Sequence, residues 1–401
     1  MYRQILIKSL NKIKPLCAVR SLATTNAASV DKKLFTPGPL GVSMTTKQAM
    51  LRDLGSRDTA FIDTVKKIRS KLLDVAGVPA QVFTSVPVQG SGTYAVEAVF
   101  HTALPTTGKA LLLVNGAYGK RMKKICELAG LAHQTEIFSE NMKVAPSAVE
   151  EILQNDPSFT LVAVVHCETS SGIINPVSEI GCIVKNHIPD ASYFVDAMSS
   201  FGAIPLDLQA SKVDYLVSSA NKCLEGVPGF SFVIARLDHL LQCKGNSTSL
   251  SLDLYDQYDN LEKTHQFRFT PPTHSMLAFQ QALLELEQEG GVLERGKRYQ
   301  KNCQIIREGM KKFGFREFLD SSHKGYIITS FCFPKDPKFV FEEFYHRLNE
   351  KGLVIYPGKV LDSDCFRIGN IGHLFPDDMT HLLQCIKEVC QEMEMSFPIN
   401  N

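Results

Sequence analysis

The sequence predicts an α/β protein in which a large domain, built on a mostly parallel sheet flanked by helices, is followed by a smaller α+β domain. Short continuous apolar runs recur after residue 110, and their lack of polar alternation indicates strands that are buried on both faces. Helical patterns separate several of these runs, and alternation of strand and helix is typical of a parallel sheet. The chain has 401 residues, of which 44% are hydrophobic, so it is long and apolar enough for two domains.

The elements of the large domain follow in chain order. A helix is predicted over residues 57–77, because apolar residues recur there at steps of three and four until Gly77 ends the pattern. The apolar runs that predict strands are 110–114, 160–167, 192–197, 214–220 and 230–235, and the helical patterns between and after them are 119–130, 146–155 and 275–290.

The remaining elements predict the smaller domain. After Gly290 and Gly291 a second long helix is expected to begin. A capped amphipathic helix is predicted over 376–393, with Asp377 and Asp378 near its start. The runs that predict strands of a smaller sheet are 326–333, 352–358 and 365–369.

These elements divide the chain into segments with different expected roles. The predicted segments are a leader (1–30), an N-terminal segment that packs near the active site (31–56), a large cofactor-binding domain (57–290) and a small C-terminal domain (291–396).

The leader differs from the rest of the chain in composition. Residues 1–30 carry five basic and no acidic side chains, together with serine, threonine and alanine. This composition is typical of a mitochondrial transit peptide, and a disordered basic tail is the alternative. We therefore expect a location in the mitochondrial matrix after removal of the leader, and otherwise in the cytoplasm.

Composition argues against several classes of function. The formal net charge is only +1, which gives no support for nucleic acid as a main partner. No apolar run is long enough to predict a membrane span. The eleven cysteines are scattered without C-x-x-C pairs or zinc spacing, so we expect reduced thiols and no metal site.

A glycine turn that carries hydroxyl groups, Gly90 to Thr93, comes directly before a helical pattern. Glycines let the backbone approach a ligand, and hydroxyls beside the free N–H groups of a helix start suit a phosphate. Ser91, Gly92 and Thr93 are therefore candidate phosphate ligands, and a simple serine N-cap is the alternative.

Asp196 stands at the end of the apolar run 192–197. Ligands of an open parallel sheet bind at the carboxyl ends of its strands. A carboxylate at that position can hold a cation, such as a metal, a pyridinium nitrogen or an imidazole. A helix N-cap or turn aspartate is the alternative.

Lys222 lies between the run 214–220 and a glycine/proline turn. Most lysines are solvated surface groups, but burial at a strand end lowers the pKa of the amine. A neutral amine can form a Schiff base with an aldehyde.

The combination is more specific than any one of these signals. A phosphate cradle comes first in the chain, then Asp196, then Lys222 26 residues later, and Asp196 and Lys222 each follow a predicted strand. Pyridoxal phosphate needs a lysine for its aldehyde, a carboxylate for its ring nitrogen and an anion cradle for its phosphate. The residues therefore predict that cofactor.

Three further side chains have secondary roles in this prediction. Tyr118 follows the run 110–114, where its ring can stack on the cofactor. Thr169 follows the run 160–167, within reach of the ring oxygen. Arg367 lies in a predicted small-domain strand and can grip a carboxylate or phosphonate, and a surface or ion-paired arginine is the alternative.

An ordered set of motifs resembles the class V aminotransferases. The resemblance runs from about residue 34 to the last helix and leaves only the leader outside. The motifs are LFTPGPLGVS (34–43), GSGTYAVEA (90–98), NGAYGKR (115–121), CETSSGIINP (167–176), VDAMSSFGA (195–203), SSANKCLEGVPG (218–229), FRFTPPTH (267–274) and FRIGNIG (366–372).

The resemblance implies the fold of type I pyridoxal-phosphate enzymes and a homodimer with active sites at the subunit interface. By resemblance, Thr270 reaches the phosphate from the neighbouring subunit. The other implied roles are Lys222 as the Schiff-base lysine, Asp196 as partner of the pyridine nitrogen, Ser91, Gly92 and Thr93 as the phosphate-binding turn, Tyr118 as the stacking ring, Thr169 as neighbour of the ring hydroxyl, and Arg367 as the substrate-anion arginine.

The resemblance also implies the reaction, amino transfer between a small-molecule amine and a 2-oxo acid. Within the family it favours 2-aminoethylphosphonate and pyruvate as substrates, giving phosphonoacetaldehyde and alanine by ping-pong kinetics. Transamination of alanine or serine with glyoxylate, or of serine with pyruvate, on the same scaffold is the alternative. A catalytically silent protein that binds the cofactor through this fold is a further one.

Overall fold

The structure is a computed structural model that describes residues 31–320, 322–357 and 364–399. The predicted leader at residues 1–30 lies outside these ranges. The chain separates into the units Met1–Asp31 and Lys32–Asn401, and the architecture below is that of the second unit.

A seven-stranded sheet forms the core of the larger part of this unit, in the order β2-β10-β9-β8-β5-β3-β4. The strands from β9 to β4 run parallel, whereas β10 is antiparallel to both of its neighbours. The prediction of a mostly parallel sheet is confirmed. The strands are β2 (Phe83–Gln89), β3 (Ala110–Val114), β4 (His133–Ile137), β5 (Leu161–Val165), β8 (Ser192–Asp196), β9 (Tyr215–Ser219) and β10 (Phe230–Arg236).

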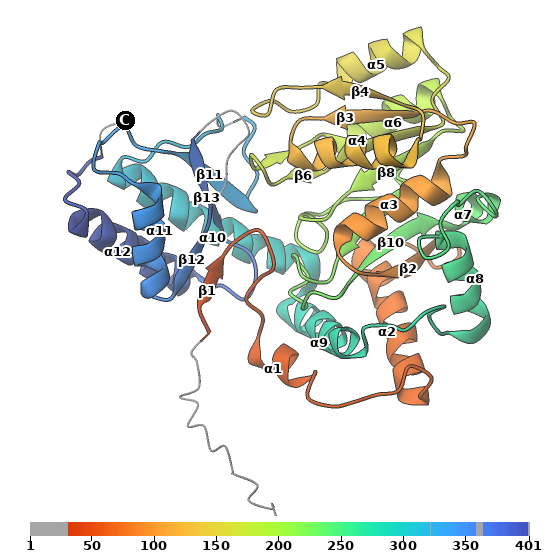
Figure 1. The fold of residues 1–401 in the computed structure, drawn as a ribbon, viewed down its shortest axis with the longest axis horizontal. Helices are drawn as coiled ribbons and strands as arrows, with labels where there is room; N and C mark the ends of the chain where they lie inside the picture. Colours follow the sequence, from red (N-terminus) through yellow and green to blue (C-terminus); the bar gives the residue numbers. More distant parts are fainter. Residues whose placement is uncertain (1–30, 321, 358–363, 400–401) are drawn as a thin grey trace, which may run out of the picture. The chain divides into compact units, whose positions relative to one another are not determined.

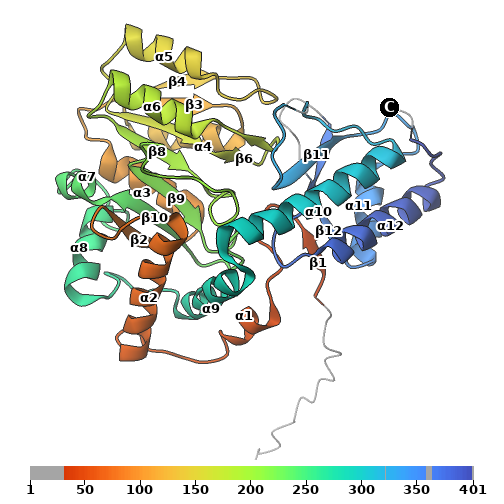
Figure 2. The same ribbon diagram turned by 180° about the vertical axis from the view of Figure 1, so that it is seen from behind.

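Helices cover both faces of this sheet. Figure 1 shows α3 and α4 in front of the strands, and the opposite view in Figure 2 shows α6 in front. Asp58 begins α2 by accepting the N–H of Ala60, and Gly77 ends it with a φ of 66°. The helices are α1 (Met44–Gln48), α2 (Thr59–Ala76), α3 (Gly92–Ala103), α4 (Ala117–Ala129), α5 (Pro146–Asn155), α6 (Val177–His187), α7 (Leu237–Gln242), α8 (Leu254–Thr264) and α9 (Thr273–Glu289).

A second sheet has four strands in the order β1-β12-β13-β11 and a hydrophobic core of its own. This sheet packs with α10, α11 and α12. Among the described residues, no helix is long and apolar enough to cross a membrane. The elements are β1 (Lys33–Phe35), β11 (Ile328–Cys332), β12 (Leu353–Pro357), β13 (Cys365–Gly369), α10 (Gly291–Phe313), α11 (Phe341–Glu350) and α12 (Pro376–Glu392), and a separate hairpin consists of β6 (Cys167–Glu168) and β7 (Ile173–Ile174).

The smaller sheet draws on both ends of the chain. β1, from the segment predicted as 31–56, pairs in parallel with β12, and Leu34 lies opposite Val354. The predicted domain boundaries remain predictions.

Two edge strands of the larger sheet were not predicted. β4 is polar and only partly buried, so it lacks a continuous apolar run. β2 contains Pro87, a residue that sequence rules place at sheet edges. An edge strand is paired on one side only and therefore carries a weaker pattern than a central one.

The parallel strands bring the predicted site residues to one edge of the sheet. Val165 at the end of β5 lies opposite Asp196 at the end of β8, and Asp196 lies opposite Val217 of β9. Lys222 follows β9 by three residues. The carboxyl ends of these strands therefore converge where ligands bind in open α/β sheets.

An ion-pair cluster holds the loop after Lys222 against α10. The Glu225 carboxylate accepts hydrogen bonds from Arg298 Nη2 at 2.7 Å and from the Tyr299 hydroxyl at 2.5 Å. Arg295 Nη1 lies 3.4 Å from the same carboxylate and donates to the Cys223 carbonyl at 2.8 Å. Because Glu225 and Arg295 are almost fully buried, the loop position depends on these contacts.

We predict that Glu225→Gln lowers the free energy of unfolding by about 3–5 kcal/mol, because it leaves buried guanidinium groups without one of their carboxylates. Urea denaturation of the cofactor-free protein measures this loss. The control is Glu294→Gln, an exposed partner of Lys297, with an expected loss below about 1 kcal/mol. Equal losses in the two variants would contradict the proposed importance of the cluster.

Candidate active site

A cavity of about 250 Å³ lies at the carboxyl ends of the parallel strands. It brings together most of the residues predicted from the strand ends. Thr169 and Arg367 are not among its lining residues, and neither is Thr270. The lining residues are Ser91, Gly92, Thr93, Val96, Tyr118, Arg121, Asp196, Met198, Ser219, Asn221 and Lys222.

The Lys222 amine is half-buried in this cavity and donates a hydrogen bond of 2.6 Å to the Pro37 carbonyl. Burial lowers the pKa of Lys222 to about 8, against opposing effects of Cys223 and Asp196. Gly38 makes the approach possible: with a φ of +120°, an added Cβ would lie 2.8 Å from the amine. The amine is therefore partly neutral at mildly alkaline pH.

The Asp196 carboxylate is buried at the end of β8. Its Oδ1 accepts the Met198 N–H at 2.9 Å. Burial raises the pKa of Asp196 to about 6, while the Met198 hydrogen bond and the charges of Arg121 and Lys222 oppose the rise. A cation placed in the cavity would favour the ionised carboxylate.

The glycine turn forms the start of α3. Ser91 is the N-cap residue, and its side chain makes no capping hydrogen bond, so the hydroxyl is available to a ligand. An added Cβ at Gly92 would lie 2.2 Å from the end of the Met198 side chain, so a larger residue there would require Met198 to move. Free N–H groups at a helix N-terminus attract an anion.

Arg367 and Thr169 are joined to each other next to Tyr118. Arg367 Nη1 donates to the Thr169 carbonyl at 2.8 Å, and the guanidinium lies 4.7 Å from the centre of the Tyr356 ring. Burial lowers the pKa of Arg367, whereas Tyr118 and Tyr356 raise it. Arg367 Nε and Thr169 Oγ1 are both buried without a hydrogen-bond partner among the described residues. Buried polar atoms are usually hydrogen-bonded, and a bound ligand could supply the partners of these two atoms.

Thr270 is exposed, and its carbonyl accepts a hydrogen bond from the Gln89 side chain. It does not line the cavity of its own chain. The structure therefore does not bring Thr270 to the other predicted phosphate ligands within one chain.

Sequence reasoning missed Arg121 and Asn221. Arg121 lies 5.0 Å from the centre of the Tyr118 ring and donates to Thr93 Oγ1 at 3.3 Å. Both residues stand inside motifs that resemble the family, Arg121 in NGAYGKR and Asn221 directly before Lys222 in SSANKCLEGVPG. Their spacing from Tyr118 and Lys222 was the signal that could have identified them.

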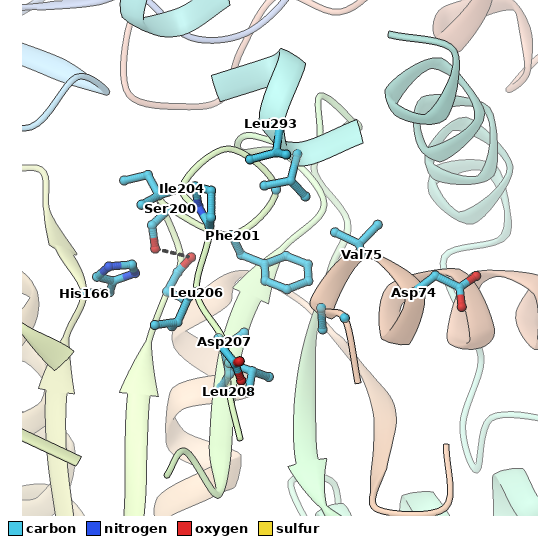
Figure 3. A pocket seen from close by; sticks show the side chains of 17 residues that line it. Asp74, Val75, His166, Ser200, Phe201, Ile204, Leu206, Asp207, Leu208 and Leu293 are labelled. Atoms are coloured by element: carbon cyan, nitrogen blue, oxygen red, sulfur yellow. Dashed lines mark hydrogen bonds between the residues drawn. The ribbon is translucent and has the colours of Figure 1, made fainter. Parts of the chain in front are cut away.

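A larger cavity, of about 330 Å³, lies beside the loop that follows β8 (Figure 3). Burial lowers the pKa of His166 in its wall to about 4, so the imidazole is neutral at neutral pH. None of the described residues that line it is a lysine or an arginine, so it offers neither an amine for an aldehyde nor a positive charge for a phosphate. The smaller cavity is therefore the candidate active site.

The residues of the smaller cavity fit pyridoxal phosphate. Lys222 supplies an amine for the aldehyde, and Asp196 supplies a buried carboxylate for the ring nitrogen. The α3 start offers free N–H groups and the Ser91 hydroxyl for the phosphate. Among the described residues, no group of three or more His, Cys, Asp or Glu side chains is arranged to hold a metal ion.

Comparison with known sequences identifies relatives over most of the chain. Residues 43–361 match the family described as aminotransferase class-V. The 2-aminoethylphosphonate–pyruvate transaminase of Salmonella paratyphi C is 50% identical over 356 residues, which are 88% of this chain and 96% of that protein. The enzyme of the same name from Klebsiella pneumoniae is 50% identical over 355 residues, with the same coverage.

Solved structures with low sequence identity share the fold. Ureidoglycine–glyoxylate aminotransferase from Bacillus subtilis superimposes with a TM-score of 0.83 at 21% identity, over 91% of this chain and 94% of that one. Pyridoxamine–pyruvate aminotransferase from Mesorhizobium loti gives 0.82 at 22% identity, over 92% and 94%. The predicted type I fold is confirmed.

The prediction of a mitochondrial location is wrong. The similar transaminases are from Salmonella and Klebsiella, which are bacteria and have no mitochondria. The prediction depended only on the basic composition of residues 1–30, which lie outside the described ranges. Such a composition is also found in tails that have no targeting role.

We predict that Asp196→Asn stabilises the cofactor-free protein at neutral pH. Burial raises the pKa of Asp196 from 3.8 to about 6, so the wild-type protein loses stability as the pH rises from about 4 to about 6. An asparagine does not titrate, so the variant should gain up to about 3 kcal/mol relative to wild type across this window. Urea denaturation at a series of pH values measures the difference, and a pH-independent difference would contradict the prediction.

Proposed function

Because the chain belongs to the class-V aminotransferase family, we propose that it transfers the amino group of 2-aminoethylphosphonate to pyruvate, giving phosphonoacetaldehyde and L-alanine. The protein is a pyridoxal-phosphate-dependent aminotransferase. The substrates are those in the name of the Salmonella and Klebsiella relatives.

The observation that carries the proposal is the meeting of Lys222 and Asp196 in one cavity, which the start of α3 also lines with Ser91, Gly92 and Thr93. The Lys222 amine has a pKa lowered to about 8 by burial, and the Asp196 carboxylate is buried without an ion-pair partner among the described residues. Neither feature stabilises the empty protein, and both suit the cofactor.

The two side chains divide the chemistry between them. Pyridoxal phosphate, when bound, supplies an aldehyde that can link to an amine and a ring that accepts electrons. Lys222 Nζ would take a proton from the substrate carbon that carries the amino group and later give a proton back, as general base and then general acid. Asp196 keeps a proton on the ring nitrogen because an ionised carboxylate stabilises the adjacent cation.

Arg367 holds the anionic end of both substrates in this proposal. Its Nε has no hydrogen-bond partner among the described residues and its Nη1 donates to the Thr169 carbonyl, so one edge of the guanidinium is oriented and another is available to a substrate. A phosphonate in one half-reaction and a carboxylate in the other present similar oxygen acceptors to an arginine.

We also propose the predicted homodimer. Thr270 is exposed and outside the cavity of its own chain, so contact with a bound phosphate would require a second copy. A monomer at equilibrium in analytical ultracentrifugation of the cofactor-loaded protein would contradict this proposal.

We predict that the purified, cofactor-loaded protein forms alanine from 2-aminoethylphosphonate and pyruvate with parallel-line ping-pong kinetics. Lys222→Ala should abolish turnover and change the visible absorbance of the bound cofactor. The same assay with alanine or serine as donor and glyoxylate as acceptor tests the second candidate. Faster turnover of that pair would reassign the substrates, and no turnover of either pair would favour a silent binding protein.

We predict that Arg367→Ala raises KM for both substrates by about 10- to 100-fold, from the loss of charge-assisted hydrogen bonds of about 1.5–3 kcal/mol. Steady-state kinetics with each substrate varied in turn measures the two values. Arg347→Ala is the control, since Arg347 pairs with Glu343 and Glu392 on the surface of the smaller part. An effect on only one substrate would contradict a shared anion site.

A further inference from the structure

Glu168 is a buried carboxylate that the proposed mechanism does not use. It ends the short strand β6, and its side chain is completely inaccessible to solvent. Burial raises the pKa of Glu168, while hydrogen bonds from Ser170, Tyr118 and Gly119 oppose the rise. A carboxyl group in such a position is expected to have a specific partner set.

The Glu168 carboxylate is the acceptor in its hydrogen bonds with neighbouring groups. Oε1 accepts the Ser170 hydroxyl at 2.7 Å and the Ser170 N–H at 3.2 Å. Oε2 accepts the Tyr118 N–H at 3.1 Å, and the Gly119 N–H also points to the carboxylate. A set of donors without an acceptor favours the ionised form, as does the N-terminus of the 13-residue helix α4.

The structure makes room for this carboxylate. An added Cβ at Gly116 would lie 2.3 Å from Glu168 Cγ and 2.5 Å from the Ser170 hydroxyl. The φ of Gly116 is 174°, so space and not backbone conformation requires the glycine. The Ser170 hydroxyl in turn accepts the Ala117 N–H at 3.3 Å, which closes a second link between the loop and α4.

The two segments that Glu168 joins carry different parts of the active site. The first turn of α4 carries Tyr118, whose ring lines the cavity. The loop after β6 carries Thr169, whose carbonyl accepts the Arg367 hydrogen bond at 2.8 Å. Glu168 is not among the residues that line the cavity, so any effect that it has on the site acts through these neighbours.

We propose that Glu168 is a positioning residue, whose buried carboxylate clamps the start of α4 to the loop 168–170 and so orients both the Tyr118 ring and the Arg367 guanidinium. This inference rests on the proposed function for the roles of Tyr118 and Arg367. A remote support of this kind matters because a shift of about 1 Å at a reacting group changes rates by about 100-fold.

The test uses the cofactor-loaded Glu168→Gln variant, which keeps the shape but replaces an acceptor by an N–H₂ donor that faces N–H donors. Two quantities are measured: the midpoint of the pH titration of the bound cofactor's visible absorbance, and the inhibition constant of methylphosphonate against turnover. We expect a lower midpoint, because a negative charge that stabilises a protonated cofactor is lost. We expect the inhibition constant to rise by about 10-fold or more as Arg367 loses its orientation.

The matched control is Asp214→Asn. Asp214 is also a buried carboxylate, but it lies at the other end of β9 and is held by Lys185, Arg236 and the Tyr193 N–H. It should lose stability without a change in either quantity. Equal changes in the two variants would overturn the proposal, because they would show a general effect of removing a buried charge.

A milder variant guards against failure of Glu168→Gln to fold. Ser170→Ala removes the 2.7 Å contact to Oε1 and leaves the charge of the carboxylate in place, so the inhibition constant should rise by a smaller factor while the absorbance midpoint stays close to that of the wild type. Wild-type values of both quantities in each variant that folds would overturn the proposal. Should the wild-type protein not use 2-aminoethylphosphonate, the proposed substrate fails, while the absorbance midpoint, which needs no substrate, still tests Glu168.

Discussion

The burial of one amine is the constraint on which the rest of the active site depends. Lys222 occupies a site where burial disfavours its charge, and its amine donates a hydrogen bond to the Pro37 carbonyl of a distant segment. The amine does not hold its own loop in place. The Glu225 carboxylate and Arg295, which grips the Cys223 carbonyl, supply that support from α10. The reactive group and the contacts that fix it therefore belong to different elements.

The arrangement of the site suits a ligand but lowers the stability of the cofactor-free protein. Asp196 is buried and has a raised pKa, and Arg367 Nε and Thr169 Oγ1 have no partner among the described residues. Each of these features destabilises the folded chain by itself, and active sites commonly have this property. A cationic ring and an anionic substrate would satisfy them together. The apolar core between the surrounding sheet and its helices supplies the compensating stability.

Sequence patterns predicted the central strands and the residues at their ends, because a strand buried on both faces is a continuous apolar run. Asp196 and Lys222 were identified in this way. The edge strands β2 and β4 escaped, since pairing on one side leaves a weaker pattern. Arg121 also escaped, although it follows Tyr118 by three residues in α4 and this spacing places two side chains on the same face of a helix. Composition alone was insufficient at residues 1–30, where it suggested a location that the bacterial relatives contradict.

By itself the sequence determined the fold class, the order of the chemical groups along the chain and the cofactor they suit, because these depend on local periodicity and on residue type at strand ends. Only the tertiary structure decided which distant groups touch. The Lys222–Pro37 contact joins residues 185 positions apart, and the Arg367–Thr169 contact joins residues 198 apart. Such contacts arise from the packing of whole elements. The local sequence around one residue therefore does not indicate which distant residue it contacts.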